Sequence, residues 1–552
     1  MTTTTLTQTS ARGIGMTREE RFVIFASSLG TVFEWYDFYL YATLAPFFAS
    51  LFFPPGNDTA ALLSAFATYA AGFLVRPFGA LIFGRIGDLV GRKYTFLITI
   101  VVMGGATFLV GLLPTFAAIG WAAPVLLVTL RLCQGLALGG EYGGAATYVA
   151  EHSRPDERGY TTSFIQTTAT LGFFLALVVI GLSRIYMDTK MFAEWGWRIP
   201  FWVSIILLVF SVYIRLKLNE TPIFQKMKDE GKGSKAPLTE SFFHYPNNKY
   251  VLLALLGATA GQGVVWYTGQ FYALFFLLIT LKLDFISSYI LIALSLIIGT
   301  PFFIFFGWLS DRIGRLKIIL AGCAIAAITY FPLFAGLTYF VNPDLAAFQK
   351  NNRVVVSADV ANCNFHIFVG PWSRFTTCDR AQDFVTKLGV SFEREATPGA
   401  GDKVSLTIGN NKVEGFDAAK WQAAFTAAGY PAKADLSKVN WVMAELIIVI
   451  MVIYVTMVYG PIAAFLVEMF PTKIRYTSMS LPYHIGNGWF GGMLPLLATA
   501  VVAATGDIYA GLWYPIGVAV MTLIVGAVFL RDTRGVDMVT GSGVAIQGKS
   551  AA

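Results

Sequence analysis

The chain has 552 residues, of which 56% are hydrophobic and only 13% are charged. An ordinary soluble chain carries about 25% charged residues, so a soluble fold of this composition would expose apolar surface over most of its area. The composition therefore excludes a cytosolic enzyme, a disordered protein and a small disulfide-rich scaffold, and it places the chain in a membrane.

Apolar stretches long enough to cross a bilayer recur along the whole chain, since about 20 apolar residues span its hydrocarbon core. The first 20 residues are polar and rich in Thr, so we expect no removable signal peptide and a first helix that directs its own insertion. Twelve transmembrane helices are predicted, at residues 22–50, 60–83, 94–113, 121–147, 160–183, 198–216, 250–280, 286–309, 317–341, 441–468, 477–504 and 508–530.

The basic residues of the loops predict the orientation. With a cytoplasmic N-terminus, both termini and the loops after even-numbered helices carry most of the loop Lys and Arg, while the short outer loops hold only Arg184, Lys190, Arg198 and Lys282. An excess of positive charge marks the cytoplasmic side. We therefore expect both termini inside, and we interpret the net charge of +7 as topology, not as affinity for nucleic acid.

Residues 342–440 interrupt this pattern. They are polar, with 11 Lys and Arg against 10 Asp and Glu, and they follow the ninth helix, which places them outside. Alternating runs predict strands at 353–359, 365–369 and 403–409, and the segment 416–429 predicts a helix. We expect a small α+β extracytoplasmic domain, which either captures substrate, contacts a periplasmic partner or caps the outer mouth.

Two of the four cysteines, Cys363 and Cys378, lie in this inserted region. A Gram-negative periplasm is oxidising, so we predict a disulfide between them. In the entropic model the closed loop would stabilise the domain by about 3 kcal/mol. The alternative is two buried free thiols. Cys133 and Cys323 lie within predicted helices.

The chain contains an internal repeat. The loop residues Gly84, Asp88, Gly91 and Arg92 recur 223 positions later as Gly307, Asp311, Gly314 and Arg315. Glu151 and Arg158 recur 317 positions later as Glu468 and Arg475. The two offsets differ by 94 residues, close to the length of the inserted region. The predicted units are a first six-helix half (1–217), a cytoplasmic linker (218–249), helices 7–9 (250–341), the inserted domain (342–440), helices 10–12 (441–530) and a cytoplasmic tail (531–552).

Two parallel halves suit alternating access, in which the substrate is held between them near the midplane. The glycines of the repeated loop permit a tight turn, and Asp beside Arg can latch a helix end on the cytoplasmic side. We therefore predict that the repeated residues form a gating motif. The alternative is ordinary loop chemistry combined with the positive charge of inner loops.

Further motifs lie in the first half, at Phe33–Tyr39, Arg76–Gly79 and Arg131–Glu141. Together with Gly84–Lys93, they make the chain resemble the major facilitator superfamily over all twelve helices, and most of all its bacterial metabolite:proton symporters. The resemblance implies the major facilitator fold and a substrate like those of the group, which include 2-oxoglutarate, citrate, shikimate, proline and betaine. It says nothing about residues 342–440.

Ionisable residues at the bilayer centre cost at least about 2.5–3.5 kcal/mol each, which makes them candidate functional residues. Glu34 and Asp37 share a face of the first helix, and Arg131 and Glu141 share a face of the fourth. We predict that these four couple transport to protons, with Asp37 or Glu34 as proton carrier and Arg131 as its partner or as an anion clamp. The alternative is a permanent ion pair between the two helices.

Polar and aromatic side chains within the helices suit a substrate pocket. Trp and Tyr also mark membrane interfaces, and Gln and Asn also tie helices together, so both interpretations stand. Arg76 and Glu445 lie near predicted helix ends, where long side chains reach the interface. The predicted substrate-binding residues are Tyr36, Arg131, Gln134, Gln166, Trp266, Tyr267, Gln270, Tyr483 and Asn487.

These features predict a proton-coupled symporter that imports a small mono-, di- or tricarboxylate across the bacterial inner membrane. One alternative is symport of a zwitterionic or neutral metabolite such as proline, betaine or a shikimate-like compound. Another is a transporter-like sensor whose outer domain binds a ligand. No zinc-protease, serine-hydrolase or nucleotide-binding motif occurs, so we expect no enzyme activity, cofactor or metal. The expected partners are the substrate, protons and lipid, with a periplasmic partner of the inserted domain as a further possibility.

Overall fold

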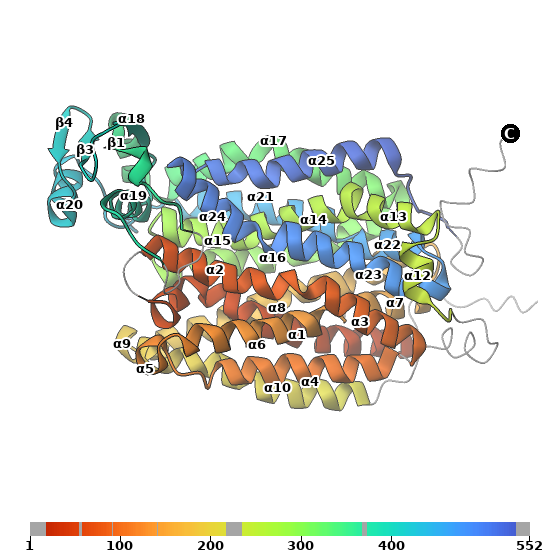
Figure 1. Ribbon diagram of the computed structural model, residues 1–552. Coiled ribbons are helices and arrows are strands. Elements are labelled where there is room, and N and C mark those ends of the chain that lie inside the picture. The colour runs from red at the N-terminus through yellow and green to blue at the C-terminus, as the bar shows by residue number, and fades with distance from the viewer. Residues whose placement is uncertain are drawn as a thin grey trace, which may run out of the picture.

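The computed structural model describes residues 18–54, 58–90, 92–140, 142–216, 234–366 and 373–536, without the side chains of a few residues such as Asp88 and Arg92. In this part of the chain, ten helices are long and apolar enough to cross a membrane. The long helix α1 and the shorter apolar segment Leu97–Val110 lie where the sequence predicts the first and third spans. The helices run side by side in one bundle, and the prediction of a twelve-helix membrane fold is confirmed (Figure 1).

The first half contains six spans, two of which are divided by a short break. Val75 separates α2 from α3 and is followed by Arg76 and Pro77; proline removes a backbone donor and fits the first turn of a helix. The helices of this half are α1 (Arg18–Phe52), α2 (Asp58–Leu74), α3 (Arg76–Leu89), α4 (Arg92–Val110), α5 (Phe116–Ile119), α6 (Ala122–Gly139), α7 (Tyr142–His152), α8 (Arg158–Tyr186), α9 (Thr189–Glu194), η1 (Gly196–Arg198) and α10 (Ile199–Leu216).

The second half repeats this plan after a short helix on the opposite side of the bundle from the inserted domain. Its seventh and eleventh spans contain π-helical turns, which widen a helix locally and are common at functional sites. Its helices are α12 (Pro237–Phe242), α13 (Asn247–Ala254), η2 (Leu255–Thr259), α14 (Ala260–Tyr267), η3 (Thr268–Tyr272), α15 (Ala273–Phe275), η4 (Phe276–Thr280), α16 (Phe285–Ile313), α17 (Arg315–Val341), α21 (Trp441–Tyr459), α22 (Ile462–Met469), η6 (Thr472–Ile474), α23 (Arg475–Ile485), η7 (Gly486–Gly492), α24 (Leu494–Thr505), η8 (Ala510–Leu512) and α25 (Trp513–Phe529).

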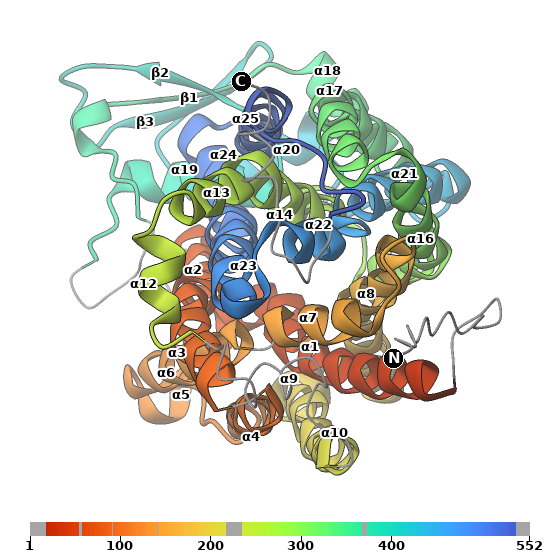
Figure 2. The same ribbon diagram turned by 90° about the vertical axis from the view of Figure 1, so that its right-hand side faces the viewer.

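Aromatic rings pack between the two halves, which Figure 2 shows as a group of red-to-yellow helices beside a group of green-to-blue ones. Tyr39 of α1 stacks on Trp266 of α14, with ring centroids 5.5 Å apart. Phe173 of α8 stacks on Phe271 of η3 at 4.2 Å. These rings are buried, so the centre of the molecule is formed by both halves together.

The inserted domain lies beyond one end of the bundle, and α12 lies at the other (Figure 1). Its sheet has the order β2-β1-β3-β4, in which β1 pairs parallel with β2 and antiparallel with β3. A disulfide joins Cys363 to Cys378. The elements of the domain are α18 (Pro343–Asn351), β1 (Val354–Ala358), η5 (Val360–Asn362), α19 (Thr377–Leu388), β2 (Glu393–Ala396), β3 (Val404–Ile408), β4 (Asn411–Glu414) and α20 (Ala418–Ala427).

The sequence locates some of these elements and misses others. β1, β3 and α20 lie within predicted segments. The strand predicted at 365–369 begins in non-strand residues at 365–366, and its remainder lies outside the described residues. The amphipathic helix α19 was not predicted, although Thr376 and Asp379 form a capping box at its start.

A candidate site between the two halves

Arg76 is the first residue of α3, directly after the break at Val75, and its side chain is fully buried. Its guanidinium carbon lies 5.5 Å from the ring centroid of Trp35, 5.7 Å from that of Phe38 and 5.1 Å from that of Phe73. No hydrogen bond of ordinary geometry joins its three nitrogens to a described residue, although the hydroxyl of Tyr267 in α14 lies close enough to interact with the guanidinium. Rings attract a cation but accept hydrogen bonds poorly, so the donors of Arg76 remain available to another group.

Residues of the second half face the same guanidinium. Tyr267 of α14, Tyr459 of α21 and Tyr483 and His484 of α23 all lie within electrostatic range of Arg76. His484 is fully buried, and neither of its ring nitrogens has a partner among the described residues. Arg76 therefore stands between the halves as a buried cation, with Tyr267 beside it and without a carboxylate partner among the described residues. This placement corrects the interpretation of Arg76 as a side chain that reaches the membrane interface.

Close packing of the second and eleventh spans positions Arg76. The indole nitrogen of Trp489 donates a hydrogen bond to the carbonyl of Leu74, 3.1 Å away, in the turn before the break. A methyl group at Gly488 would lie only 2.9 Å from the carbonyl oxygen of Phe73. A glycine at this position therefore lets the eleventh span approach the backbone that carries Arg76.

The two carboxylates of the first helix have different surroundings. Glu34 forms an ion pair with Arg215 of α10, with 2.7 Å between Oε1 and the guanidinium nitrogen, and both side chains are buried. Asp37 is equally buried but forms no ion pair among the described residues, and Ser204 of α10 lies beside it. Glu34 is thus held by a cation from the sixth span, whereas Asp37 is a membrane-buried carboxyl group with no cation partner.

Arg131 does not form the ion pair with Glu34 or Asp37 that was expected as one alternative. Its guanidinium donates to Gln134 Oε1 at 2.6 Å and to the carbonyl of Phe38 at 3.4 Å. It also lies over the rings of Phe38, Tyr41 and Tyr69, with distances of 4.4, 4.7 and 5.3 Å. Arg131 is therefore surrounded mainly by α1, α2 and α6, although Tyr267 of the second half lies within electrostatic range. The Nε and Nη2 atoms of Arg131 have no hydrogen-bond partner among the described residues.

Several predicted substrate-binding side chains are already engaged in bonds between helices. The hydroxyl of Tyr36 donates to Pro200 O at 2.7 Å. The amide of Gln134 donates to the hydroxyl of Thr107 at 2.7 Å. Asn487 and Gln262 exchange two hydrogen bonds of 2.8 and 2.9 Å. These contacts tie spans together within one half, as polar residues commonly do in membranes.

Other predicted residues lie at the interface of the halves. Tyr142 and Tyr483 stack across it at 3.5 Å, and the amide of Gln166 donates to the Tyr142 hydroxyl at 2.6 Å. The polar atoms of Gln270 and the indole nitrogen of Trp266 are buried without a partner among the described residues. Of the predicted residues, Tyr267 and Tyr483 lie within electrostatic range of Arg76, and Trp266 and Gln270 lie on the same seventh span as Tyr267. A small polar molecule bound there would supply the missing partners.

The gating motif of the second half holds the two halves together at the end where α12 lies. Asp311 accepts hydrogen bonds from the backbone N–H groups of Gly159 and Tyr160 at 2.8 and 2.7 Å, at the start of α8 in the first half. A carboxylate is stabilised at a helix N-terminus. Arg315 joins Asp311 to Glu468 and binds the latter through two contacts of 3.0 Å. We call this cluster, with the pairs described next, the inner gate, because the sequence predicts that the motif gates transport and that this end faces the cytoplasm.

The repeated Glu and Arg residues pair across the halves. Glu151 of the first half lies 3.4 Å from Arg475 of the second, and Arg158 of the first lies 3.6 Å from Glu468 of the second. The two copies of the motif therefore exchange partners. The first residues of each motif copy were predicted in a loop but lie in a helix, Gly84 in α3 against Tyr476 and Gly307 in α16. Gly91 and Glu141 lie outside the described residues, as do the side chains of Asp88 and Arg92.

Residues 27–349 match the model of the Major Facilitator Superfamily, which is more than half of the chain. The chain belongs to this superfamily. It is a multi-pass membrane transporter, not an enzyme.

Several bacterial transporters are similar to the chain over part of its sequence. The inner membrane metabolite transport protein YhjE of Escherichia coli is 44% identical over 39% of the chain, and the match spans only 49% of that transporter. The shikimate transporter of E. coli is 35% identical over 56% of the chain and 71% of its own length. The E. coli alpha-ketoglutarate permease is 34% identical over 62% of the chain and 78% of its own length. The proton:xylose symporter XylE has the same fold, with a TM-score of 0.61 at 14% identity over 94% of the chain and 97% of its own.

The sequence did not identify Arg76 and Arg215 as candidate site residues, and the structure explains why. Arg76 lies near the middle of the apolar window 58–87, directly after a helix break, and its side chain is fully buried there. Arg215 lies at the end of the sixth span and pairs with a helix 181 positions earlier, which no local pattern predicts. The sequence did contain one signal for Arg76: it is an arginine within an apolar stretch and has no carboxylate close to it in the sequence.

Proposed function

We propose that the protein is a proton-coupled importer of small organic anions across a bacterial inner membrane, with Arg76 as the group that binds the anion. The observation that carries this proposal is the buried guanidinium of Arg76, which faces both halves, has no carboxylate partner among the described residues, and has only the Tyr267 hydroxyl as a nearby polar side chain in hydrogen-bonding range. A guanidinium offers two parallel donors that match a carboxylate. An organic acid is therefore the class of substrate that suits this site.

Two further observations support this assignment. Among the relatives matched over more than two thirds of their own length are a shikimate transporter and an alpha-ketoglutarate permease, both carriers of carboxylates by name, and a putative proline/betaine transporter. The rings of Trp35, Phe38 and Phe73 around Arg76 suit the carbon skeleton of a small acid. An anion bound here touches both halves, so its binding can bias the movement of one half against the other.

Asp37 is the proposed proton carrier. It is buried in the first helix and has no cation partner among the described residues, whereas Glu34 is held by Arg215. A carboxyl group in such a place can gain and lose a proton as the site opens to either side. Proton entry with the anion would offset the charge of the substrate, which gives net import a driving force.

The experiment is uptake by the full chain reconstituted in liposomes that contain a pH-sensitive dye. The panel comprises shikimate, 2-oxoglutarate, proline and betaine, and the variants are Arg76→Lys and Arg76→Gln. Loss of charge-assisted hydrogen bonds to the anion reduces uptake about 10- to 100-fold in Arg76→Gln. Arg353→Gln, at an exposed arginine of the inserted domain, is the matched control and retains uptake. Full activity of Arg76→Gln with every acid would refute the assignment.

A second candidate is a zwitterion such as proline or betaine. The aromatic rings around Arg76 are the observation that favours it, since such rings also bind ammonium groups. A betaine carboxylate at Arg76 would leave the quaternary ammonium over the rings. The panel separates the two candidates. Acids without an amine compete with radiolabelled betaine if the site selects organic anions, and they fail to compete if it selects zwitterions.

A further inference from the structure

The inserted domain is anchored to the second half at the outer ends of several spans. The backbone N–H of Phe392 donates to Gly506 O at 2.8 Å, and the backbone N–H of Ile508 donates to the hydroxyl of Ser391 at 3.2 Å. The ammonium of Lys282 donates to the carbonyl of Lys387 at 2.6 Å, at the end of α19. The domain therefore moves with the second half, into which it is also inserted in the chain.

One helix of the domain also reaches the first half. Asp383 of α19 accepts a hydrogen bond of 2.7 Å from the backbone N–H of Thr59, in the first turn of α2. One turn further along α19, Lys387 forms an ion pair with Asp58, the first residue of α2. The carboxylate of Asp383 is favoured at the N-terminus of α2, where the backbone N–H groups carry a partial positive charge. Asp383 and Lys387 lie one turn apart on the same face of α19, so both reach α2. We call these two contacts the outer latch.

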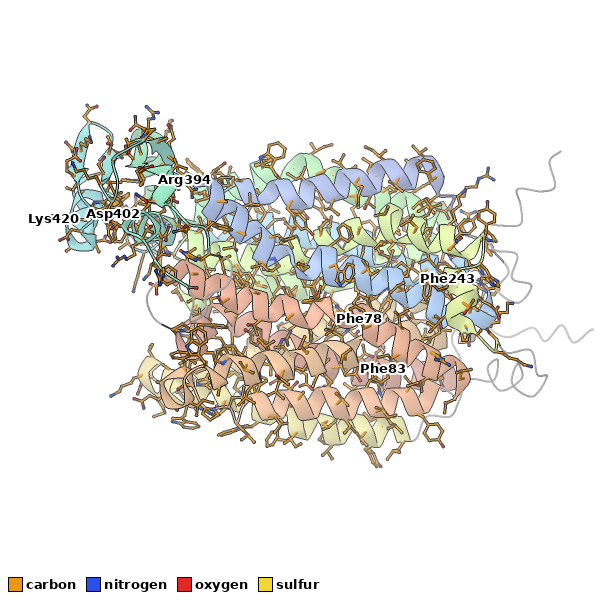
Figure 3. All side chains as sticks on the ribbon, viewed as in Figure 1. Phe78, Phe83, Phe243, Arg394, Asp402 and Lys420 are labelled. Atoms are coloured by element: carbon orange, nitrogen blue, oxygen red, sulfur yellow. A yellow bond between two sulfur atoms is a disulfide. The ribbon has the colours of Figure 1, made fainter. Side chains whose placement is uncertain are left out.

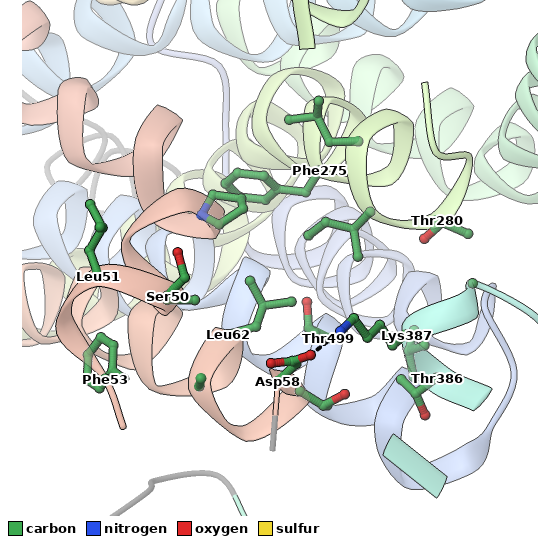
Figure 4. Close-up of a pocket in the computed structure, with 18 of the residues that line it drawn as sticks. Ser50, Leu51, Phe53, Asp58, Leu62, Phe275, Thr280, Thr386, Lys387 and Thr499 are labelled. Carbon is green, nitrogen blue, oxygen red and sulfur yellow. Dashed lines mark hydrogen bonds and ion pairs between the residues drawn. The ribbon is translucent and has the colours of Figure 1, made fainter. Parts of the chain in front are cut away.

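The outer latch borders a cavity of about 910 Å³ between the halves. Its walls come from both halves and from α19, and include Ser50, Leu62, Phe275, Thr499, Thr386 and Lys387 (Figure 4). In the seventh span, Phe275 lies eight residues from Tyr267 toward the inserted domain, so the cavity lies on the outer side of the Arg76 site. The outer cavity is therefore the route by which a substrate would arrive from outside.

We propose that the inserted domain is an outer gate, whose latch on α2 must release for the transporter to open outward. The inference rests on alternating access as part of the proposed function. To admit substrate, the outer end of α2 must separate from the second half. Because α19 is fixed to the second half and bound to the first turn of α2, that separation breaks both contacts of the outer latch. The inner gate is closed in the same structure, so the two gates together enclose the central site.

A crosslink tests the requirement for release. In a chain whose Cys133 and Cys323 are replaced by Ser, the variant Asp58→Cys/Lys387→Cys is crosslinked across the outer latch with a short bifunctional thiosulfonate reagent, which reductant removes. The locked protein loses uptake at least about tenfold, and reduction restores it. The matched control is Asp344→Cys/Lys438→Cys, which replaces an ion pair of 2.7 Å between the beginning and the end of the inserted region. Its crosslink leaves uptake unchanged, and reductant applied to the cysteine-substituted parent corrects for effects on Cys363–Cys378.

Accessibility tests the same inference without any substrate. Ala61→Cys places a thiol in the wall of the outer cavity, at a residue that is 7% exposed. An impermeant maleimide applied from outside labels this thiol about tenfold faster when Asp383→Ala and Lys387→Met remove the latch. The control removes the same charges from the far side of the domain with Asp402→Ala and Lys420→Met (Figure 3).

The outcomes separate this inference from the proposed function. Unchanged uptake in the quantitatively locked protein, or equal labelling in the latch and control variants, overturns the outer gate. If the parent imports none of the compounds, the proposed function fails, and the labelling rates alone decide whether the domain closes the cavity. Faster labelling with normal uptake in the latch variant supports a gate that controls opening of the outer cavity without affecting substrate binding at Arg76.

Discussion

The carboxylate of Glu151 lies 3.4 Å from the guanidinium of Arg475, and this pair joins the first half of the protein to the second at the inner gate. Its repeat-related counterpart joins Arg158 to Glu468 at 3.6 Å. In each pair, the glutamate of one copy of the motif binds the arginine of the other copy, so both pairs cross from one half to the other. This exchange makes the repeat an interface, so the separation of the halves must break both pairs together.

Removal of Glu151 is expected to loosen the inner gate. Both side chains of its pair are only 1% exposed, and breaking a buried ion pair typically costs about 3–5 kcal/mol because the remaining charge stays buried. Arg475 also donates to the carbonyls of Val467 and Phe470, so we expect the lower end of that range. Maleimide labelling of Thr147→Cys from the cytoplasmic side measures the effect, since Thr147 is buried against Met479 of the second half.

The control for this prediction is Glu194→Gln, which removes the same group from an exposed pair with Lys190. Exposed pairs contribute about 0–1 kcal/mol, so labelling of Thr147→Cys should match the parent. Equal labelling in Glu151→Gln and Glu194→Gln would show that the inner gate does not depend on the exchanged pairs.

The repeat also provides a matched pair of glycines. A methyl group at Gly307 would lie 2.4 Å from Ser163 Cβ and 2.6 Å from Gly159 O, whereas one at Gly84 would lie 3.5 Å from the nearest atom of Tyr476. Gly307→Ala should therefore prevent the eighth span from closing on α8 and reduce uptake at least about tenfold, while Gly84→Ala changes it little. Uptake kinetics at equal membrane expression check this. Similar effects of both substitutions would mean that the close approach of α16 to α8 at Gly307 does not limit transport.

The sequence predicts the helices and the symmetry of the molecule well because both follow from local composition and from repetition. Twelve apolar windows and two copies of a loop are visible without any contact between distant residues. The pairing of charges is different, because it depends on which helix faces which. The sequence places Arg131 near a carboxylate of α1, but the structure gives Glu34 to Arg215 and surrounds Arg131 with Gln134 and aromatic rings.

Arg76 shows the same limit at the candidate site. Its position beside Pro77 suggests a helix end, and a helix end suggests a charge that reaches the membrane surface. The span instead continues as α3 beyond the break, and the eleventh span covers the guanidinium. The sequence left the aromatic residues between a substrate pocket and the membrane interface, because which of them face Arg76 depends on the rotation of each helix.

Glu34→Gln is expected to destabilise the protein more than Asp37→Asn. Glu34 is in a buried ion pair with Arg215, and its loss leaves a buried cation at a cost of about 3–5 kcal/mol. Asp37 has no cation partner among the described residues, so its replacement by an amide of the same shape leaves no charge unpaired. Thermal unfolding of the purified variants in detergent measures the difference. Equal unfolding temperatures would argue against the ion pair as a structural element.

Asp37→Asn is expected to uncouple transport from protons. The amide cannot take up a proton, so substrate-driven acidification of the liposome interior should disappear while exchange of external for internal substrate continues. The measurement compares dye acidification with counterflow of radiolabelled substrate in the same vesicles. Acidification that survives in Asp37→Asn would assign the proton to another carboxyl group, and loss of both signals would indicate a binding defect instead.

Acidic conditions outside the membrane are expected to weaken the outer latch. Burial, together with the neighbouring Asp58 carboxylate, raises the pKa of Asp383 above its usual value of 3.8, while the bonds from Thr59 act in the opposite direction. Charged groups from each neighbouring element face this carboxyl group or its partners, namely Asp58 of α2, Lys387 of α19 and Lys282 of the loop after the seventh span. As the external pH falls toward the raised pKa, Asp383 becomes protonated and loses its attraction to the N-terminus of α2.

Labelling of Ala61→Cys from outside should therefore rise with acidity, and Asp383→Asn should remove this dependence because its side chain stays neutral at every pH. A pH profile that is the same with and without Asp383 would assign the effect to another group.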